Sequence, residues 1–220
     1  RQRQMCIRDR ESIYCYGVSD CEQPTSLNEA KLLYTSLITL GIRIEEQQWI
    51  PANDFKNMLG IIQPVSYVLS KFAPEYFFPY LFLCRIFELN KIADFFNIDL
   101  PDMPKRTDYK GRCMYYCELC EAFYQFRKEN KLSPEELWAF LYDFAPNNIV
   151  NENTEIPKPS QVWFIGGLLY EEDRLLESKF WQSSPETKRG DILIHYETSP
   201  VSAITCIETS LTDGVIDPLF

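Results

Sequence analysis

The last part of the chain, from Gln161 to Phe220, constrains the fold more than any other segment. It contains three short runs rich in β-branched and aromatic residues, Val162–Ile165, Ile192–Tyr196 and Ala203–Ile207. Gly, Asp, Ser and Pro separate these runs, a pattern typical of β-strands joined by turns. We therefore predict an antiparallel sheet or barrel in this segment.

The order of the residues around these runs is more specific than any single run. The ordered set is Trp163-Phe164, Gly166-Gly167, Trp181, Gly190-Asp191, the Ile192–Tyr196 run, Ser199-Pro200 and Ala203-Ile204. It resembles the EVE domain of the PUA-like superfamily over roughly the first half of such a domain. The resemblance implies a β-barrel truncated at the C-terminus, because the strands that would close it do not appear before Phe220.

The same resemblance implies a shallow aromatic pocket that accepts a modified base flipped out of a nucleic acid. Stacking on an aromatic wall contributes on the order of 1–3 kcal/mol per base, and flipping costs a few kcal/mol. Trp163 and Trp181 would form the walls, with Tyr196 and Ser199 as polar contacts. The alternative for both tryptophans is that they pack inside the sheet, as large aromatic residues usually do. Asp191 is expected to be a turn residue, because it follows Gly190.

Residues 26–150 have the patterns of an α-helical domain. Ser26 to Glu29 has the form of a capping box and opens a helix that ends before Gly41. Three-to-four spacing of apolar residues predicts two short helices between Phe55 and Phe72, a helix or helix pair over Tyr80–Phe96, and a long helix over Gly111–Asn130. Ser133-Pro134 opens another helix. Its predicted buried stripe consists of Leu137, Phe140, Leu141 and Phe144.

The fold class that follows is α+β, with an α-helical N-terminal domain followed by the first half of a PUA-like barrel. The polar segment 151–160, with Pro157 and Pro159, reads as a linker between the two. Arg1–Arg10 resembles a translated sequencing adapter and is excluded from the fold prediction. Residues 11–25 are left without predicted structure, as an uncertain or disordered segment. We expect a fragment whose natural ends are both missing.

Charge argues against extensive contact with nucleic acid. The chain has 22 Lys and Arg against 32 Asp and Glu, a net charge of −10, whereas phosphate binding depends on basic residues. A pocket that reads one flipped base needs few phosphate contacts. One basic cluster beside aromatic residues could supply them: Lys105, Arg106, Lys110 and Arg112.

No run of eighteen apolar residues appears, so no membrane span is expected. The cysteines lack disulfide spacing, which favours a reduced, cytoplasmic protein.

Cys113, Cys117 and Cys120 have the spacing with which radical S-adenosylmethionine enzymes hold an iron–sulfur cluster. Positions i, i+4 and i+7 also form one stripe of a helix, and buried cysteines behave as small apolar residues. The helical reading is favoured, and we expect no metal or other cofactor. The single histidine, His195, lies within a strand run, and the chain has no glycine-rich phosphate loop.

The resemblance therefore implies a non-enzymatic reader of a modified base in DNA or RNA. The pairing of a helical domain with such a reader is similar to bacterial proteins of defence or restriction, which implies that context by analogy. The alternative is a protein-interaction or structural module in which the aromatic-rich helices bind a partner protein. A remote alternative is an iron–sulfur enzyme that uses the three cysteines.

Overall fold

In a computed structural model the chain contains helices and strands in two compact units. The structure describes residues 13–14, 22–40, 42–44, 48–50, 54–83, 85–150, 155–167 and 182–219. The helical unit comprises residues 1–83, 88–151 and 217–220, and the sheet unit comprises residues 84–87 and 152–216. Residues 1–10, part of the expected linker and Trp181 lie outside the described residues.

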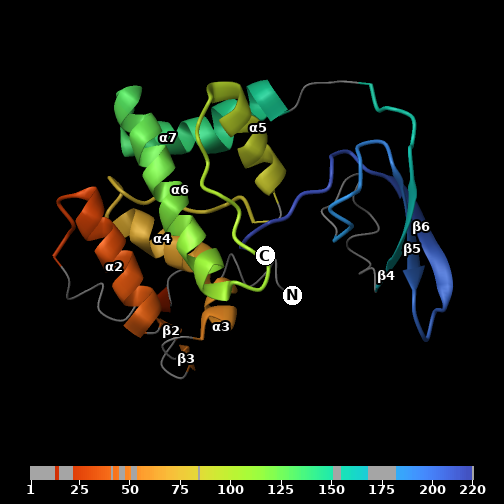
Figure 1. Cartoon of the computed structure of the whole chain (residues 1–220), viewed down its shortest axis with the longest axis horizontal. Helices are drawn as coiled ribbons and strands as arrows, with labels where there is room; N and C mark the ends of the chain where they lie inside the picture. The colour runs from red at the N-terminus through yellow and green to blue at the C-terminus, as the bar shows by residue number, and fades with distance from the viewer. Residues whose placement is uncertain are drawn as a thin grey trace. The chain divides into compact units, whose positions relative to one another are not determined.

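The helical unit is built around its longest helix, α6. Figure 1 shows α6 among the other helices of this unit, and it packs against α2 and α3. The helices are α2 (Leu27–Leu40), α3 (Phe55–Leu59), α4 (Ile62–Phe72), α5 (Ile86–Phe96), α6 (Tyr109–Glu129) and α7 (Pro134–Ala139), followed by the π-helical segments η1 (Phe140–Phe144) and η2 (Pro146–Val150).

Aromatic side chains of several helices and loops meet around Tyr116 of α6. Its ring is inaccessible to solvent, and its hydroxyl donates to the carbonyl of Phe78 at 2.8 Å. Nearby, the buried Tyr34 hydroxyl donates to the carbonyl of Cys113 at 2.7 Å. The rings with centroids 5.5 to 6.5 Å from Tyr116 are those of Tyr34, Phe77, Phe78 and Tyr80. The buried hydroxyls of Tyr116 and Tyr34 thus each have a carbonyl acceptor, which offsets the cost of removing them from water.

The capping box predicted at Ser133 is confirmed. The amide of Glu136 donates to the Ser133 hydroxyl at 3.2 Å, and the Glu136 carboxylate accepts from the Ser133 amide at 2.7 Å. The buried stripe predicted beyond it is partly wrong. Leu137 and Leu141 are buried, but Phe144 is 52% exposed. From Phe140 the backbone is π-helical, and hydrogen bonds to the fifth residue rotate the following side chains off the α-helical stripe.

The helix predicted from Tyr80 begins later, at Ile86. Tyr80 follows Pro79, and its amide donates to the hydroxyl of Ser66 at 2.7 Å, so this segment is fixed without helical hydrogen bonds.

The N-terminal part of the chain also contains a small antiparallel sheet that the sequence did not predict. Its strands are β1 (Ile13–Tyr14), β2 (Ile42–Ile44) and β3 (Gln48–Ile50). Such short strands carry almost no periodic signal.

The sheet unit contains β4 (Val162–Gly166), β5 (Ile192–Glu197) and β6 (Ala203–Thr209), in the order β4-β5-β6. β5 and β6 are antiparallel, whereas β4 and β5 are parallel. The expectation of an antiparallel sheet is therefore wrong for β4 and β5. The connection between them is long enough for the crossover that a parallel pair requires. The result is a three-stranded mixed sheet.

The two faces of this sheet differ in exposure. In register, Trp163 lies opposite Leu193 and Phe164 lies opposite Ile194. The face with Leu193 and His195 is buried, whereas the opposite face is apolar and accessible to solvent. Its exposed members are Val162, Phe164, Tyr196, Ile204 and Ile207.

The chain returns to the helical unit after the sheet. Leu219 is buried there, and the Arg112 guanidinium on α6 donates from Nε to the carbonyl of Pro218 at 2.8 Å. In the described part of the chain, none of the helices combines the length and apolar character needed to cross a membrane.

Candidate base-binding region

Asp191, at the start of β5, organises the part of the sheet unit that carries Trp163. Its carboxylate is inaccessible to solvent. One oxygen accepts from the Ser160 hydroxyl at 2.7 Å, from the Ser160 amide at 3.1 Å and from the Gln161 amide at 3.0 Å. The other accepts from the Trp163 indole N–H at 3.0 Å and from the Lys188 amide at 2.8 Å. Asp191 is therefore more than the turn residue that the sequence predicted.

These donors also fix the charge state of Asp191. The Lys188 amide, followed by the Trp163 indole and the Ser160 hydroxyl, holds the pKa of the Asp191 carboxyl well below its ordinary value of 3.8. Hydrogen bonds to a carboxylate favour its charged form over its protonated form. Asp191 is thus an anion that joins the start of β4 to the loop before β5.

A second aspartate, Asp213, also binds the loop before β5, through Lys188 and Arg189. Its carboxylate accepts from the Arg189 amide at 2.8 Å and lies 3.3 Å from the Lys188 ammonium. Between these residues Gly190 has a φ of 95°, and a Cβ there would lie 2.4 Å from the carbonyl oxygen of Pro157. Only glycine fits this position without strain. The loop that begins directly after Trp181 is therefore closely held.

Of the four residues predicted to contact a base, the structure describes three, and it places Trp163 and Tyr196 on opposite faces of the sheet. Trp163 is half-buried, with its indole edge bound to Asp191. Trp163 pairs with Leu193, and Tyr196 pairs with Gly166. Because successive residues of a strand alternate between its faces, Tyr196 lies on the face opposite Trp163. Ser199 is exposed in the turn after β5, and Trp181 lies outside the described residues. Trp163 and Tyr196 therefore do not line one pocket.

On the same face as Trp163, a contact between His195 and Glu208 joins β5 to β6. His195 is 2% exposed, and its Nε2 lies 2.7 Å from a carboxylate oxygen of Glu208. The expected strand-face histidine is confirmed. Its side chain is buried and contacts Glu208 of the neighbouring strand β6.

The predicted basic cluster divides into two kinds of residue. Lys105, Arg106 and Lys110 are exposed at the start of α6. Arg112 is buried, and besides Pro218 its guanidinium donates to the carbonyl of Arg106 at 3.1 Å. Arg112 thus has a structural role in holding the C-terminal segment. The three exposed residues remain the candidates for phosphate contact.

The three spaced cysteines lie on α6, as their helical period predicted. Burial raises the pKa of Cys113 and of Cys117 to about 12 and that of Cys120 further. A thiol must lose its proton to bind a metal, and buried thiols of this kind are inert. Among the described residues, no group of three or more His, Cys, Asp or Glu side chains could hold a metal ion. The geometry therefore favours a packing role for these cysteines.

Comparison with known proteins identifies no matching family model, no matching curated protein and no matching solved structure.

Proposed function

We propose that the sheet unit is the first part of an EVE-type, PUA-like barrel that reads a modified base in DNA or RNA. The base enters an aromatic pocket walled by Trp163 and Trp181. Tyr196 is not part of this pocket, because it lies on the other face of the sheet.

The observation that carries the proposal is the bond network of Asp191. Its carboxylate holds the indole edge of Trp163 and, at the same time, the Lys188 amide of the loop that follows Trp181. One buried anion thereby links the strand that carries the first wall to the loop that follows the second. A stacking site needs walls fixed before the base arrives, because ordering them on binding costs affinity.

The exposed apolar face of the sheet supports the proposal that these strands belong to a barrel. Phe164 is 72% exposed and Ile207 is 66% exposed. In a small closed barrel one face of every strand packs into the interior. In such a barrel the exposed face with Phe164 and Tyr196 would be the packed one, and Trp163 lies on the other face, half-buried beside Asp191.

The acidic balance of the chain fits a reader of a single base better than a groove binder. Each phosphate that a protein neutralises steepens the salt dependence of its affinity. With Lys105, Arg106 and Lys110 as the exposed candidates, we expect a shallow salt dependence and selectivity dominated by the base. A base held by stacking is discriminated by its shape and its hydrogen-bonding edge.

The test is a tryptophan-fluorescence titration with oligonucleotides of one sequence, single- and double-stranded, with and without methylated or hydroxymethylated bases. We expect quenching by one modified strand. Trp181→Ala weakens its binding by roughly 5- to 150-fold, the equivalent of about 1–3 kcal/mol of stacking. Trp163→Phe keeps a stacking ring but loses the N–H that binds Asp191, so we expect a smaller loss.

Trp138→Phe, in the helical unit, is the matched control and should leave the affinity unchanged. Circular dichroism of each variant separates a lost contact from lost folding. Equal affinity for modified and unmodified strands, or full affinity in a folded Trp181→Ala variant, would contradict the proposal.

A further inference from the structure

A cysteine, a histidine and a glutamate share one face of the sheet unit, where β5 pairs with β6. In the antiparallel register His195 lies opposite Cys206, and Leu193 lies opposite Glu208 two residues further along. Residues directly opposite each other project to the same face, with their Cβ atoms about 4.5–5.5 Å apart. The imidazole, the thiol and the carboxylate therefore occupy neighbouring positions of one face.

The carboxylate of this cluster contacts the histidine ring at one nitrogen. His195 Nε2 lies 2.7 Å from a carboxylate oxygen of Glu208, and the His195 side chain is almost completely buried. An ionised carboxylate accepts hydrogen bonds but cannot donate them, so this contact favours a proton on Nε2. In the neutral ring Nδ1 then carries the lone pair that can take a proton. A thiol beside a base that a third group orients is the arrangement that activates nucleophiles.

Cys206 differs from the cysteines of α6 in its surroundings. Cys113, Cys117 and Cys120 are buried, and burial raises the pKa of each thiol. Cys206 is partly accessible to solvent and lies opposite an imidazole. Reactive cysteines in proteins are partly exposed and have a basic neighbour, whereas buried cysteines in apolar surroundings are inert. Of the cysteines in the described part of the chain, Cys206 is thus the one placed to react.

The strand pairing is interrupted beside this cluster. The register passes from His195 opposite Cys206 to Tyr196 opposite Ile204, so Thr205 is the extra residue of a β-bulge. Bulges re-aim side chains and are over-represented next to active sites. Within the described residues the Thr205 hydroxyl is also buried without a hydrogen-bond partner. A buried polar atom in that state is uncommon, and a role in binding or catalysis is one of its explanations.

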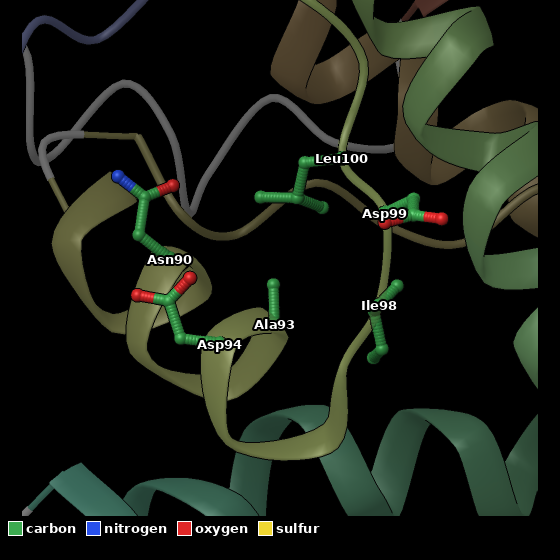
Figure 2. Close-up of a pocket in the computed structure, with 6 residues that line it drawn as sticks. All are labelled: Asn90, Ala93, Asp94, Ile98, Asp99 and Leu100. Carbon is green, nitrogen blue, oxygen red and sulfur yellow. The ribbon is translucent and has the colours of Figure 1, made fainter.

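A pocket on the helical unit offers different chemistry. Its volume is about 390 Å³, and Figure 2 shows its lining residues: Asn90, Ala93, Asp94, Ile98, Asp99 and Leu100. The two carboxylates can attract a cation, but these six side chains include no thiol, hydroxyl or imidazole. Compared with this pocket, the cluster on the sheet is the one equipped for covalent chemistry.

We propose that Cys206 is a nucleophilic thiol that bonds covalently to a small, uncharged electrophile, with His195 as the base and Glu208 as the residue that positions it. The thiol proton passes to Nδ1 of His195, and the sulfur attacks the electrophilic carbon. The S–C bond forms as the bond to the leaving group breaks, and the leaving group departs with that electron pair. The negative charge of Glu208 on this face repels an anionic electrophile. This chemistry does not depend on base reading.

The test measures how fast iodoacetamide alkylates Cys206 in the full chain at about pH 6, where an ordinary thiol is less than about 1% ionised. Iodoacetamide is small and uncharged, and iodide is its leaving group. Trypsin and mass spectrometry isolate the site, because residues 190–220 contain no Lys or Arg and Cys206 is their single cysteine. The same chain unfolded in urea is the reference. We expect the folded chain to react at least about tenfold faster, whereas partial burial alone would slow it.

Variants assign the roles of the base and of the positioning residue. His195→Gln keeps a polar side chain without a base, so we expect its folded rate to fall below the unfolded rate. Glu208→Gln keeps an acceptor for Nε2 and should retain more of the acceleration than Glu208→Ala. Thr209→Ala, at the exposed neighbour of Glu208 on the other face of β6, is the matched control and should change nothing.

A charged reagent tests which electrophiles the site accepts. Iodoacetate has the same leaving group but carries a negative charge. Relative to iodoacetamide, we expect iodoacetate to react at least about threefold less well with the folded chain than with the unfolded chain. Glu208→Gln should reduce this difference. Equal discrimination in the folded and unfolded chains would contradict the assigned preference for an uncharged electrophile.

Two results would overturn the proposed thiol chemistry. The first is a folded parent chain in which Cys206 reacts more slowly than in urea. This comparison needs no variant, so it decides the question even if His195→Gln does not fold. The second is full acceleration in a His195→Gln variant that circular dichroism shows to be folded, because a different group would then take the proton.

Discussion

Replacing Asp191 with Ala should disorder the start of β4 and the loop before β5 and should remove any base binding. The change leaves five donors without their acceptor, among them the Trp163 indole and the hydroxyl of Ser160. Hydrogen bonds to a charged group contribute more than those between neutral groups, so losing five of them at once is costly. In hydrogen–deuterium exchange, we expect protection of the β4 and β5 amides to fall at least about tenfold. Protection in α6 should be unchanged.

The isosteric change Asp191→Asn separates the negative charge from the shape of the side chain. Asparagine keeps one acceptor oxygen, so some of these bonds survive, and we expect an intermediate loss of protection.

The lowered pKa of Asp191 also predicts how the stability of the sheet unit depends on pH. The folded-state pKa of Asp191 lies below its ordinary value of 3.8, so its contribution to stability is complete above that value. It is lost as the pH falls below 3.8 towards the folded-state pKa.

The control for Asp191 is Asp213→Ala, which removes one amide contact and an exposed ion pair at the same loop. We expect a smaller effect on protection. Equal protection in the Asp191→Ala variant and the parent chain would contradict the role assigned to Asp191.

Replacing Tyr116 with Ala should produce the largest loss of stability in the helical unit. The ring is inaccessible to solvent and contacts four other aromatic rings. Removing a buried aromatic side chain costs about 3–5 kcal/mol. Tyr116→Phe keeps the ring and removes only the hydroxyl that binds the Phe78 carbonyl, so we expect a loss of about 1–2 kcal/mol.

Urea denaturation followed by circular dichroism at the helical signal measures these differences. Met103→Ala, at a 42% exposed loop residue, should stay within about 0.5 kcal/mol of the parent chain. If Tyr116→Ala cost no more than Met103→Ala, α6 would not be the centre of this unit's core.

Local signals in the sequence predicted much of the helical unit. The capping box at Ser133 lies within four residues, and the apolar period of α6 is sustained over many turns, so neighbouring residues carry the information. The prediction of buried positions from apolar spacing was wrong where the backbone is π-helical rather than α-helical. Phe144 was expected on a buried stripe, and the π-helical segment that displaces it has no recognisable sequence pattern.

The candidate site was less predictable because its parts meet only through pairing of distant strands. The sequence shows that Trp163 and Tyr196 lie in strands, but only the parallel register of β4 and β5 shows that they occupy opposite faces. The bond between Asp191 and Ser160 likewise joins residues that are far apart in the chain.

The most direct test of base reading is photo-crosslinking of the full chain to an oligonucleotide that carries one 5-iodo-substituted pyrimidine, followed by mass spectrometry of the joined peptides. Iodinated bases crosslink efficiently to aromatic rings stacked on them, and stacking is the contact proposed for the two tryptophans. We expect crosslinks at Trp163 or Trp181, suppressed by an excess of the preferred modified strand. Crosslinks confined to Lys105, Arg106 or Lys110, or none at all, would contradict a base-reading pocket in the sheet unit.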